Sequence, residues 1–228
     1  SEPSQIIAYL INFFTINKIT SKTKLKALVT AGPTKEYIDP VRFISNQSSG
    51  KQGYEIARSL AKRDIDTTLI SGPTNLDTPE NVNIIRVETA NEMFEETKKK
   101  LPADIAICAA AVSDFKIANF YNNKIKKKDK MSLDFEKNID ILEYLSNHNS
   151  LRPKLVLGFA AETNDLLKNA QEKILAKHCD WIIANDISKA GTSFGSDFNE
   201  VSIVYKEKNK QNETLSRRRK SEIAEIIT

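Results

Sequence analysis

Short apolar runs alternate with amphipathic segments along most of the chain. Residues 26–32 (KALVTAG) are apolar and β-branched and end at a glycine, which predicts a buried strand. In residues 53–64 the apolar side chains recur three and four positions apart, as on one face of a helix. Residues 66–71 return to strand character before a Gly-Pro pair. The order strand, loop, helix, strand predicts a β-loop-α-β unit.

The same alternation continues toward the C-terminus. Strands are predicted at residues 83–89, 104–112, 154–160 and 181–186, and helices at residues 90–101 and 164–178. Residues 201–216 have the pattern of a hairpin closed by a polar turn, and a basic helix is predicted from about Arg217. We therefore expect a Rossmann-like α/β fold with a mostly parallel sheet, helices on both faces and ligands at the carboxyl ends of the strands.

Two stretches interrupt this alternation of strands and helices. Residues 32–50, between the first strand and the first helix, are predicted to form an irregular loop. Residues 116–132 (KIANFYNNKIKKKDKMS) are basic, polar and too long for an ordinary tight connection. The second stretch indicates a long basic flap, arm or disordered insertion, and its many like charges predict mobility without a ligand.

The N-terminal segment separates from the main domain by composition. Residues 1–23 are predicted to be a helix and a linker, and residues 24–228 one globular domain. The apolar stretch IIAYLINFF is far shorter than a membrane span and lacks the flanks and cleavage site of a signal peptide. A cytoplasmic protein is expected.

Composition narrows the classes of function. The 34 basic residues are nearly balanced by 30 acidic ones, which disfavours a nucleic acid as the main partner and suits a small anionic substrate. With Cys108, Cys179 and two histidines as the only such residues, no cluster has zinc-ligand spacing. Any metal is expected to arrive with phosphates, and no side chain is predicted as its ligand.

A glycine-containing segment precedes the first predicted helix. Residues 46–53 (NQSSGKQG) place backbone N–H groups and hydroxyls where a helix N-terminus can hold an anion, although an ordinary serine cap with a turn glycine fits the same spacing. Ser45 and Gln52 stand where a Walker A loop needs glycine and Ser or Thr. The dinucleotide fingerprint is also missing after the first strand, which disfavours an NAD-dependent reductase.

Several blocks of sequence together resemble one family. Residues 32–57 (GPTKEYIDPVRFISNQSSGKQGYEIA) resemble the opening signature of the phosphopantothenoylcysteine synthetases, also called phosphopantothenate–cysteine ligases. Further similar blocks follow in the family's order: AAAVSDF, NKIKK, KNIDIL, GFAAET and ANDIS. The resemblance covers about nine-tenths of the chain. The N-terminal piece resembles the last helix of the flavin-dependent decarboxylase that many bacteria fuse to this ligase, although a simple amphipathic helix on the domain edge fits it too.

The resemblance implies a reaction and its participants. Family members join 4′-phosphopantothenate to L-cysteine in coenzyme A biosynthesis through an acyl-cytidylate, and release pyrophosphate and CMP. The resemblance implies CTP as co-substrate, with ATP less favoured, and Mg²⁺ bridging the phosphates. FMN would belong only to a fused decarboxylase. A homodimer is implied, or a larger assembly with that decarboxylase, with neither a nucleic acid nor a membrane as partner. The alternative is a non-catalytic nucleotide-binding domain.

The resemblance also implies roles for residues around the opening loop. Asn46 would stabilise the reacting acyl group and Lys124 would assist the acyl-cytidylate chemistry, both as catalytic residues, although Lys124 lies in a lysine run that a solvated segment explains as well. Arg42 would grip a phosphate, or form only a surface ion pair. The other substrate-binding positions are Ser48, Ser49, Gly50, Ala110 and Ala111.

A second group of positions corresponds to the nucleotide site. Asp114 would accept hydrogen bonds from the ribose or the base, with a turn-forming aspartate as the alternative. Phe159 would offer a flat apolar surface to the base. The segment around the base and ribose comprises Asn138, Ile139, Asp140, Ile141 and Leu142, where Ile139 replaces a proline common in bacterial relatives. Lys173 and Lys177 would lie on one helix face near the triphosphate, unless they are ordinary surface lysines.

Overall fold

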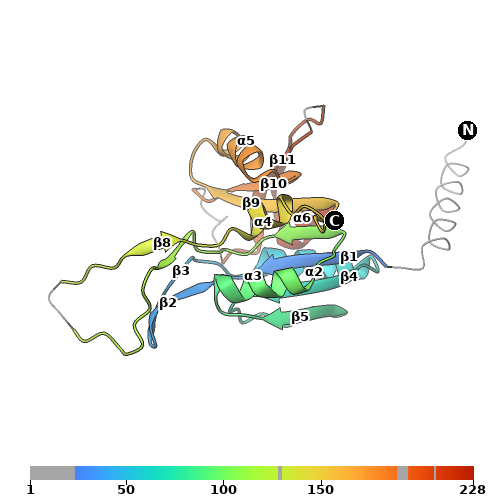
Figure 1. Cartoon of the computed structure of the whole chain (residues 1–228). Coiled ribbons are helices and arrows are strands. Elements are labelled where there is room, and N and C mark those ends of the chain that lie inside the picture. Colours follow the sequence, from blue (N-terminus) through green and yellow to red (C-terminus); the bar gives the residue numbers. More distant parts are fainter. Residues whose placement is uncertain (1–23, 128–129, 189–194, 208) are drawn as a thin grey trace, which may run out of the picture.

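The structure is a computed structural model that describes residues 24–127, 130–188, 195–207 and 209–228 (Figure 1). The N-terminal helix predicted within residues 1–23 lies outside the described residues. In the described part of the chain, no helix is both long and apolar enough to cross a membrane.

An eight-stranded sheet forms the centre of the molecule, in the order β12-β11-β10-β9-β6-β1-β4-β5. The strands from β10 to β5 are parallel, whereas β11 pairs antiparallel with both β10 and β12. The bounds are β1 Lys26–Ala31, β4 Asp66–Ser71, β5 Val82–Arg86, β6 Ile105–Cys108, β9 Leu155–Glu162, β10 Trp181–Asp186, β11 Phe198–Tyr205 and β12 Glu213–Arg219. The predicted mostly parallel α/β sheet is confirmed.

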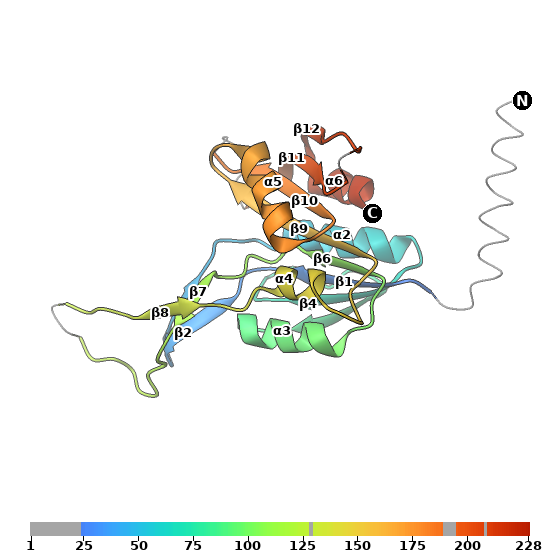
Figure 2. The same ribbon diagram turned by 45° about the horizontal axis from the view of Figure 1, so that its top comes forward.

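Helices cover both faces of this sheet (Figure 2). One face carries α2 and α6, which pack against each other, and the other carries α3, α4 and α5. The bounds are α2 Lys51–Lys62, α3 Ala90–Lys99, α4 Ile141–Ser146, α5 Leu166–Lys177 and α6 Lys220–Ile227. The start of α3 is fixed by a capping box in which Thr89 and Glu92 bind each other's backbone N–H groups.

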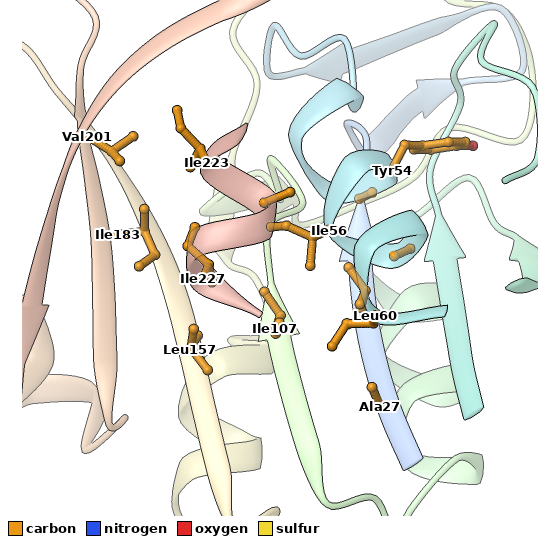
Figure 3. Close-up of a cluster of buried hydrophobic side chains, with 14 of the residues drawn as sticks. Ala27, Tyr54, Ile56, Leu60, Ile107, Leu157, Ile183, Val201, Ile223 and Ile227 are labelled. Carbon is orange, nitrogen blue, oxygen red and sulfur yellow. The ribbon is translucent and has the colours of Figure 1, made fainter. Parts of the chain in front are cut away.

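The alternation of side chains along β1 divides the core between the two faces. Val29 and Ala31 point to the α2 and α6 side, whereas Leu28 joins the cluster beneath the other three helices. On the first side, Ile223 of α6 and Ile56 of α2 lie in the same apolar cluster over the sheet (Figure 3). Burial on both faces explains why the central strands are continuous apolar runs in the sequence.

Two small antiparallel pairs extend from the carboxyl edge of the sheet. Strands β2 (Lys35–Asp39) and β3 (Arg42–Ser45) form a hairpin, so the prediction of an irregular loop over residues 32–50 was wrong for this part. Strands β7 (Phe115–Ile117) and β8 (Phe135–Lys137) close the base of the long basic insertion. In both views the two pairs project together away from the sheet, and we call them the arm (Figures 1 and 2).

The C-terminal elements differ from prediction in their bounds. The predicted hairpin is confirmed by the pairing of β11 with β12, but β12 continues to Arg219. Helix α6 therefore starts at Lys220, three positions after the predicted start at Arg217. The side chains of Ile223, Ala224 and Ile227 are buried, and this apolar spacing fixes which residues turn toward α2.

Candidate functional site

Two cavities lie at the carboxyl edge of the sheet and share a wall. The first, about 500 Å³, lies beside the start of α2, and the second, about 320 Å³, lies between α4 and α5. Their common wall consists of Ala110, Val112, Asp114, Phe159 and Lys173. A ligand that reaches across this wall would contact both faces of the sheet.

The start of α2 provides an anion-binding surface for the first cavity. Gly50 precedes the helix with φ of +74°, a conformation that favours glycine, and in the described part of the chain no side chain caps this end. The first turn contains Lys51 and no acidic residue. The positive end of the helix dipole and its free N–H groups therefore face the cavity lined by Ser48, Ser49 and Gly50.

The loop carrying Asn46 is held against the end of the strand edge. Asn46 Nδ2 donates to the backbone oxygen of Val112 at 3.0 Å. The backbone N–H of Ala111 donates to Gly32 O at 2.8 Å, and Thr34 N donates back to Ala111 O at 3.4 Å. These bonds place Asn46, Ala110 and Ala111 around the same cavity, and the small alanine side chains leave the backbone open to a ligand.

Two lysines of α5 face the cavities in different electrostatic settings. Lys173 Nζ donates to the backbone oxygen of Phe159 at 3.1 Å and lines both cavities. Lys177 Nζ lies 2.7 Å from Asp140 and 2.9 Å from Glu143. Burial opposes the charge of Lys177, but the hydrogen bonds and charges of the two carboxylates outweigh it and raise its pKa. Lys177 is thus held in an ion-paired position at the mouth of the second cavity.

The remaining wall of the second cavity is built from a short segment before α4. Asn138 is buried, and its Nδ2 donates to Ser113 O at 3.1 Å while its backbone N–H donates to Asp114 O at 2.8 Å. Asp140 caps α4 by accepting from Glu143 N at 2.8 Å. The residues predicted for the nucleotide that line this cavity are Asp114, Asn138, Ile139, Asp140, Ile141, Leu142, Phe159, Lys173 and Lys177.

Arg42 and Lys124 do not line either cavity. Arg42 Nη2 donates to Ile125 O at 2.9 Å, and Asp39 Oδ2 accepts from Ile125 N at 3.0 Å. The Asp39 carboxyl is buried, which by itself raises its pKa, but three backbone N–H groups and Arg42 outweigh burial and lower that pKa. The insertion is therefore bonded to the β2–β3 hairpin beside Lys124, and its mobility without a ligand stays a prediction.

Several polar residues of the first cavity were missed by the sequence analysis. They come from α2, β10, β11 and α6, and they are Lys51, Gln52, Asn185, Asn199 and Lys220. Lys51 and Gln52 lie within the NQSSGKQG segment and could have been included with it. Lys220 gave no such signal, because it was attributed to a basic helix with no expected contact to α2.

Metal ligands are sparse around these cavities. Among residues 24–127, 130–188, 195–207 and 209–228, no group of three or more His, Cys, Asp or Glu residues surrounds one point. Asp114 is an exposed carboxylate on the wall of both cavities and offers hard oxygen ligands, which suit a Mg²⁺ ion that is bound mainly by phosphate oxygens. The arrangement as a whole suits a phosphorylated ligand at the helix start.

Comparisons with known proteins agree on one relationship. The chain is 42% identical to the coenzyme A biosynthesis bifunctional protein CoaBC of Haemophilus influenzae and 41% identical to that of Borreliella burgdorferi, over 98% of its own length in each case. It covers 55% and 56% of those proteins, so it spans about half the length of the curated relatives it matches.

A solved structure shows the same fold. The crystal structure of the C-terminal domain of the coenzyme A biosynthesis bifunctional protein CoaBC is 34% identical and superposes with a TM-score of 0.74, covering 89% of this chain and 91% of that one. Residues 22–228 match the model of the family described as the DNA/pantothenate metabolism flavoprotein C-terminal domain. The chain therefore belongs to the DNA/pantothenate metabolism flavoprotein C-terminal domain family.

Proposed function

We propose that this chain is a ligase that joins 4′-phosphopantothenate to L-cysteine in coenzyme A biosynthesis, using CTP and forming an acyl-cytidylate. One observation carries the proposal: every residue assigned to substrate or nucleotide by resemblance, except Arg42 and Lys124, lines one of two cavities that share a wall. Segments separated by more than a hundred positions thus converge on one place. The relatives that share this sequence are named for coenzyme A biosynthesis.

In the first step, the carboxylate of 4′-phosphopantothenate attacks the α-phosphorus of CTP and pyrophosphate leaves. The base and ribose occupy the second cavity, next to Phe159 and Asp114. Lys173, on the common wall, and the uncapped first turn of α2 then flank the phosphates. Their positive charge and N–H groups stabilise the negative charge that builds on the phosphate oxygens.

In the second step, the cysteine amine attacks the acyl carbon and CMP leaves. The acyl oxygen gains negative charge in this step, and it needs a hydrogen-bond donor at that moment. Asn46 Nδ2 carries two N–H groups, of which one is directed to Val112 O. The second N–H is available for the acyl oxygen, while the bond to Val112 keeps the amide in place.

Mg²⁺ fits this site as a partner of the phosphates. Asp114 would be the residue that holds the ion beside the phosphates. When bound, the ion neutralises phosphate charge. Lys173 and the α2 N-terminus, by contrast, hold the phosphates through the protein itself.

We infer that the chain works as a homodimer through the arm. Large apolar side chains are exposed on the arm and on the insertion between β7 and β8, with relative exposures of 47% for Phe43, 50% for Phe135 and 53% for Phe120. Several exposed large apolar side chains in one part of the molecule favour burial against a second copy. Because the arm projects away from the sheet (Figure 1) and Lys124 lines neither cavity of its own subunit, Lys124 would serve the cavity of the partner subunit.

The activity is tested by pyrophosphate release. CTP, 4′-phosphopantothenate and Mg²⁺ should release pyrophosphate much faster than the same mixture with ATP, GTP or UTP, and adding cysteine should yield CMP. Equal rates with all four nucleotides would contradict the assignment of CTP. No release with any of them would contradict the ligase assignment.

The dimer is tested by mixing two inactive variants. In a mixed dimer of Asn46→Asp and Lys124→Gln subunits, one site regains both residues only if Lys124 acts across the interface. Random mixing should then restore about a quarter of wild-type activity, since half of the dimers are mixed and each has one intact site. Absence of recovery, with mixed dimers shown to form, would place Lys124 at the cavity of its own subunit.

A further inference from the structure

Lys220 is an unusual buried cation on the wall of the first cavity. Its relative exposure is 7%, and it lines the cavity together with Lys51 and Asn199. Its Nζ donates to the backbone oxygen of Ser196 at 2.6 Å, and within the described residues no carboxylate lies within ion-pair distance of it. Buried lysines usually have a paired charge, so this one lacks its ordinary partner.

The backbone fixes Lys220 in this position from both sides. Its N–H donates to Asp197 O at 2.9 Å, and its carbonyl oxygen accepts from Gln52 Nε2 at 3.1 Å. The second of these bonds joins the start of α6 to the first turn of α2. The lysine is therefore placed beside an uncapped helix N-terminus, which is itself positive.

A second lysine adds to the positive charge at this place. Lys51, the first residue of α2, contacts the exposed Asp197 at 2.6 Å and Gly195 O at 3.1 Å. Burial and the nearby Lys51 ammonium lower the pKa of Lys220, although the Asp197 carboxylate opposes this effect. One exposed carboxylate thus faces two lysines and a helix dipole, and the local charge is left positive.

We propose that Lys220, with Lys51 and the first turn of α2, forms a subsite that binds a phosphate group of one of the two phosphorylated substrates. A phosphate there would bring negative charge to two lysines. Its oxygens would accept hydrogen bonds from the Lys220 ammonium and from the backbone N–H groups at the start of α2. This inference rests on the proposed function for the identity of the substrates. The phosphate comes either from the nucleotide, as its β- and γ-phosphates, or from the phosphomonoester of 4′-phosphopantothenate.

The test compares Lys220→Met and Lys51→Met with the wild type. Calorimetry with inorganic pyrophosphate and with inorganic phosphate gives two dissociation constants, and kinetics give KM for CTP and for 4′-phosphopantothenate. Loss of a charge-assisted hydrogen bond should weaken the relevant ligand about ten- to hundredfold. Weaker binding of pyrophosphate together with a raised KM for CTP would assign the subsite to the nucleotide. Weaker binding of phosphate together with a raised KM for 4′-phosphopantothenate would assign it to the other substrate.

The controls separate binding from folding. Lys62→Met changes an exposed lysine at the other end of α2 and should leave all four constants unchanged. Lys220→Arg keeps the charge and should restore much of the affinity. If Lys220→Met does not fold, Lys51→Met decides, since Lys51 is half-buried and its loss does not empty the core. Binding of the inorganic anions does not depend on turnover, so it tests the subsite even if the ligase assignment fails. Four unchanged constants in folded Lys220→Met, or in Lys51→Met, would overturn the proposal.

Discussion

Gly53→Ala tests how the close packing of α2 on β1 positions the anion-binding end of the helix. On helix propensity alone, alanine in place of a helical glycine would stabilise the protein by about 1 kcal/mol. A Cβ at Gly53, however, would lie 2.5 Å from Ala31 Cβ and 3.2 Å from Thr30 O. Ordinary contacts begin at 3.4 Å. The helix would therefore have to move outward by about 1 Å in an interior that is close-packed.

The size of the effect follows from these contacts. Ala31 is fully buried in a central strand, and neither methyl group can rotate out of the clash. Overpacking costs about 1–3 kcal/mol, and because neither methyl group can move away we expect the upper part of that range, about 2–3 kcal/mol. After the propensity gain of about 1 kcal/mol the net loss is about 1–2 kcal/mol. This corresponds to a melting temperature about 2–8 °C lower for a protein of this size. A shift of about 1 Å at the start of α2 should also slow pyrophosphate release about a hundredfold.

The measurements are urea unfolding, thermal unfolding and pyrophosphate release from CTP and 4′-phosphopantothenate. Gly195→Ala serves as the matched control, because a Cβ there would meet nothing within 4 Å, and its stability should change by less than about 0.5 kcal/mol. A Gly53→Ala protein as stable and as active as the wild type would refute the reasoning. It would show that α2 can retreat from β1 without disturbing the cavity.

Three further substitutions or treatments test other parts of the site. Asn46→Asp should let the acyl-cytidylate form and then accumulate, as quench-flow experiments would show, because the carboxylate repels both the acyl oxyanion and Val112 O. Unchanged turnover would mean that Asn46 has no catalytic role. Lys177→Met should raise KM for CTP about tenfold, because Asp140 loses its cation at the cavity mouth and the site becomes more negative. An unchanged KM would make Lys177 a purely structural residue. Burial raises the pKa of the Cys108 thiol to about 12. Iodoacetamide at pH 8.5 should therefore label Cys108 about a hundredfold more slowly in the folded than in the unfolded protein. Peptide mass mapping measures both labelling rates. Since unfolded thiols ionise near pH 9 and this one stays protonated, folding stability should also fall as pH rises from about 9 to 12; labelling equally fast in both states would contradict the raised pKa.

The parallel centre of the fold could be predicted because both faces of its strands are buried. Burial on two faces produces continuous apolar runs, such as residues 26–32, that are distinct from the helices between them. The β2–β3 hairpin was missed because apolar and buried positions do not coincide along it: Phe43 and Val41 are exposed, whereas Glu36 and Asp39 are buried. Helix α4, with six residues, is too short for a periodic pattern to be recognised.

The location of some residues of the candidate site could be predicted from the sequence, and that of others could not. The location of residues in compact motifs, such as Asn46 and Asp114, at the cavity could be predicted because neighbours in the chain are also neighbours at the strand ends. The placement of Lys124 could not be predicted, since its position depends on where the arm projects. Lys220 was missed because only the packing of α6 on α2 brings it to the cavity, and no local pattern encodes that contact.

The contact between α2 and α6 also determines when the cavity can form during folding. Gln52 bonds to Lys220 across 168 positions of the chain, and Ser59 bonds to Thr228 across 169. Contacts between such distant segments require closure of a very long loop and form slowly. The first cavity is therefore completed only after β11, β12 and α6 have joined the sheet. A phosphate-containing ligand present during refolding should raise the final yield of native protein without accelerating the earlier steps, because no earlier species has the wall that binds it.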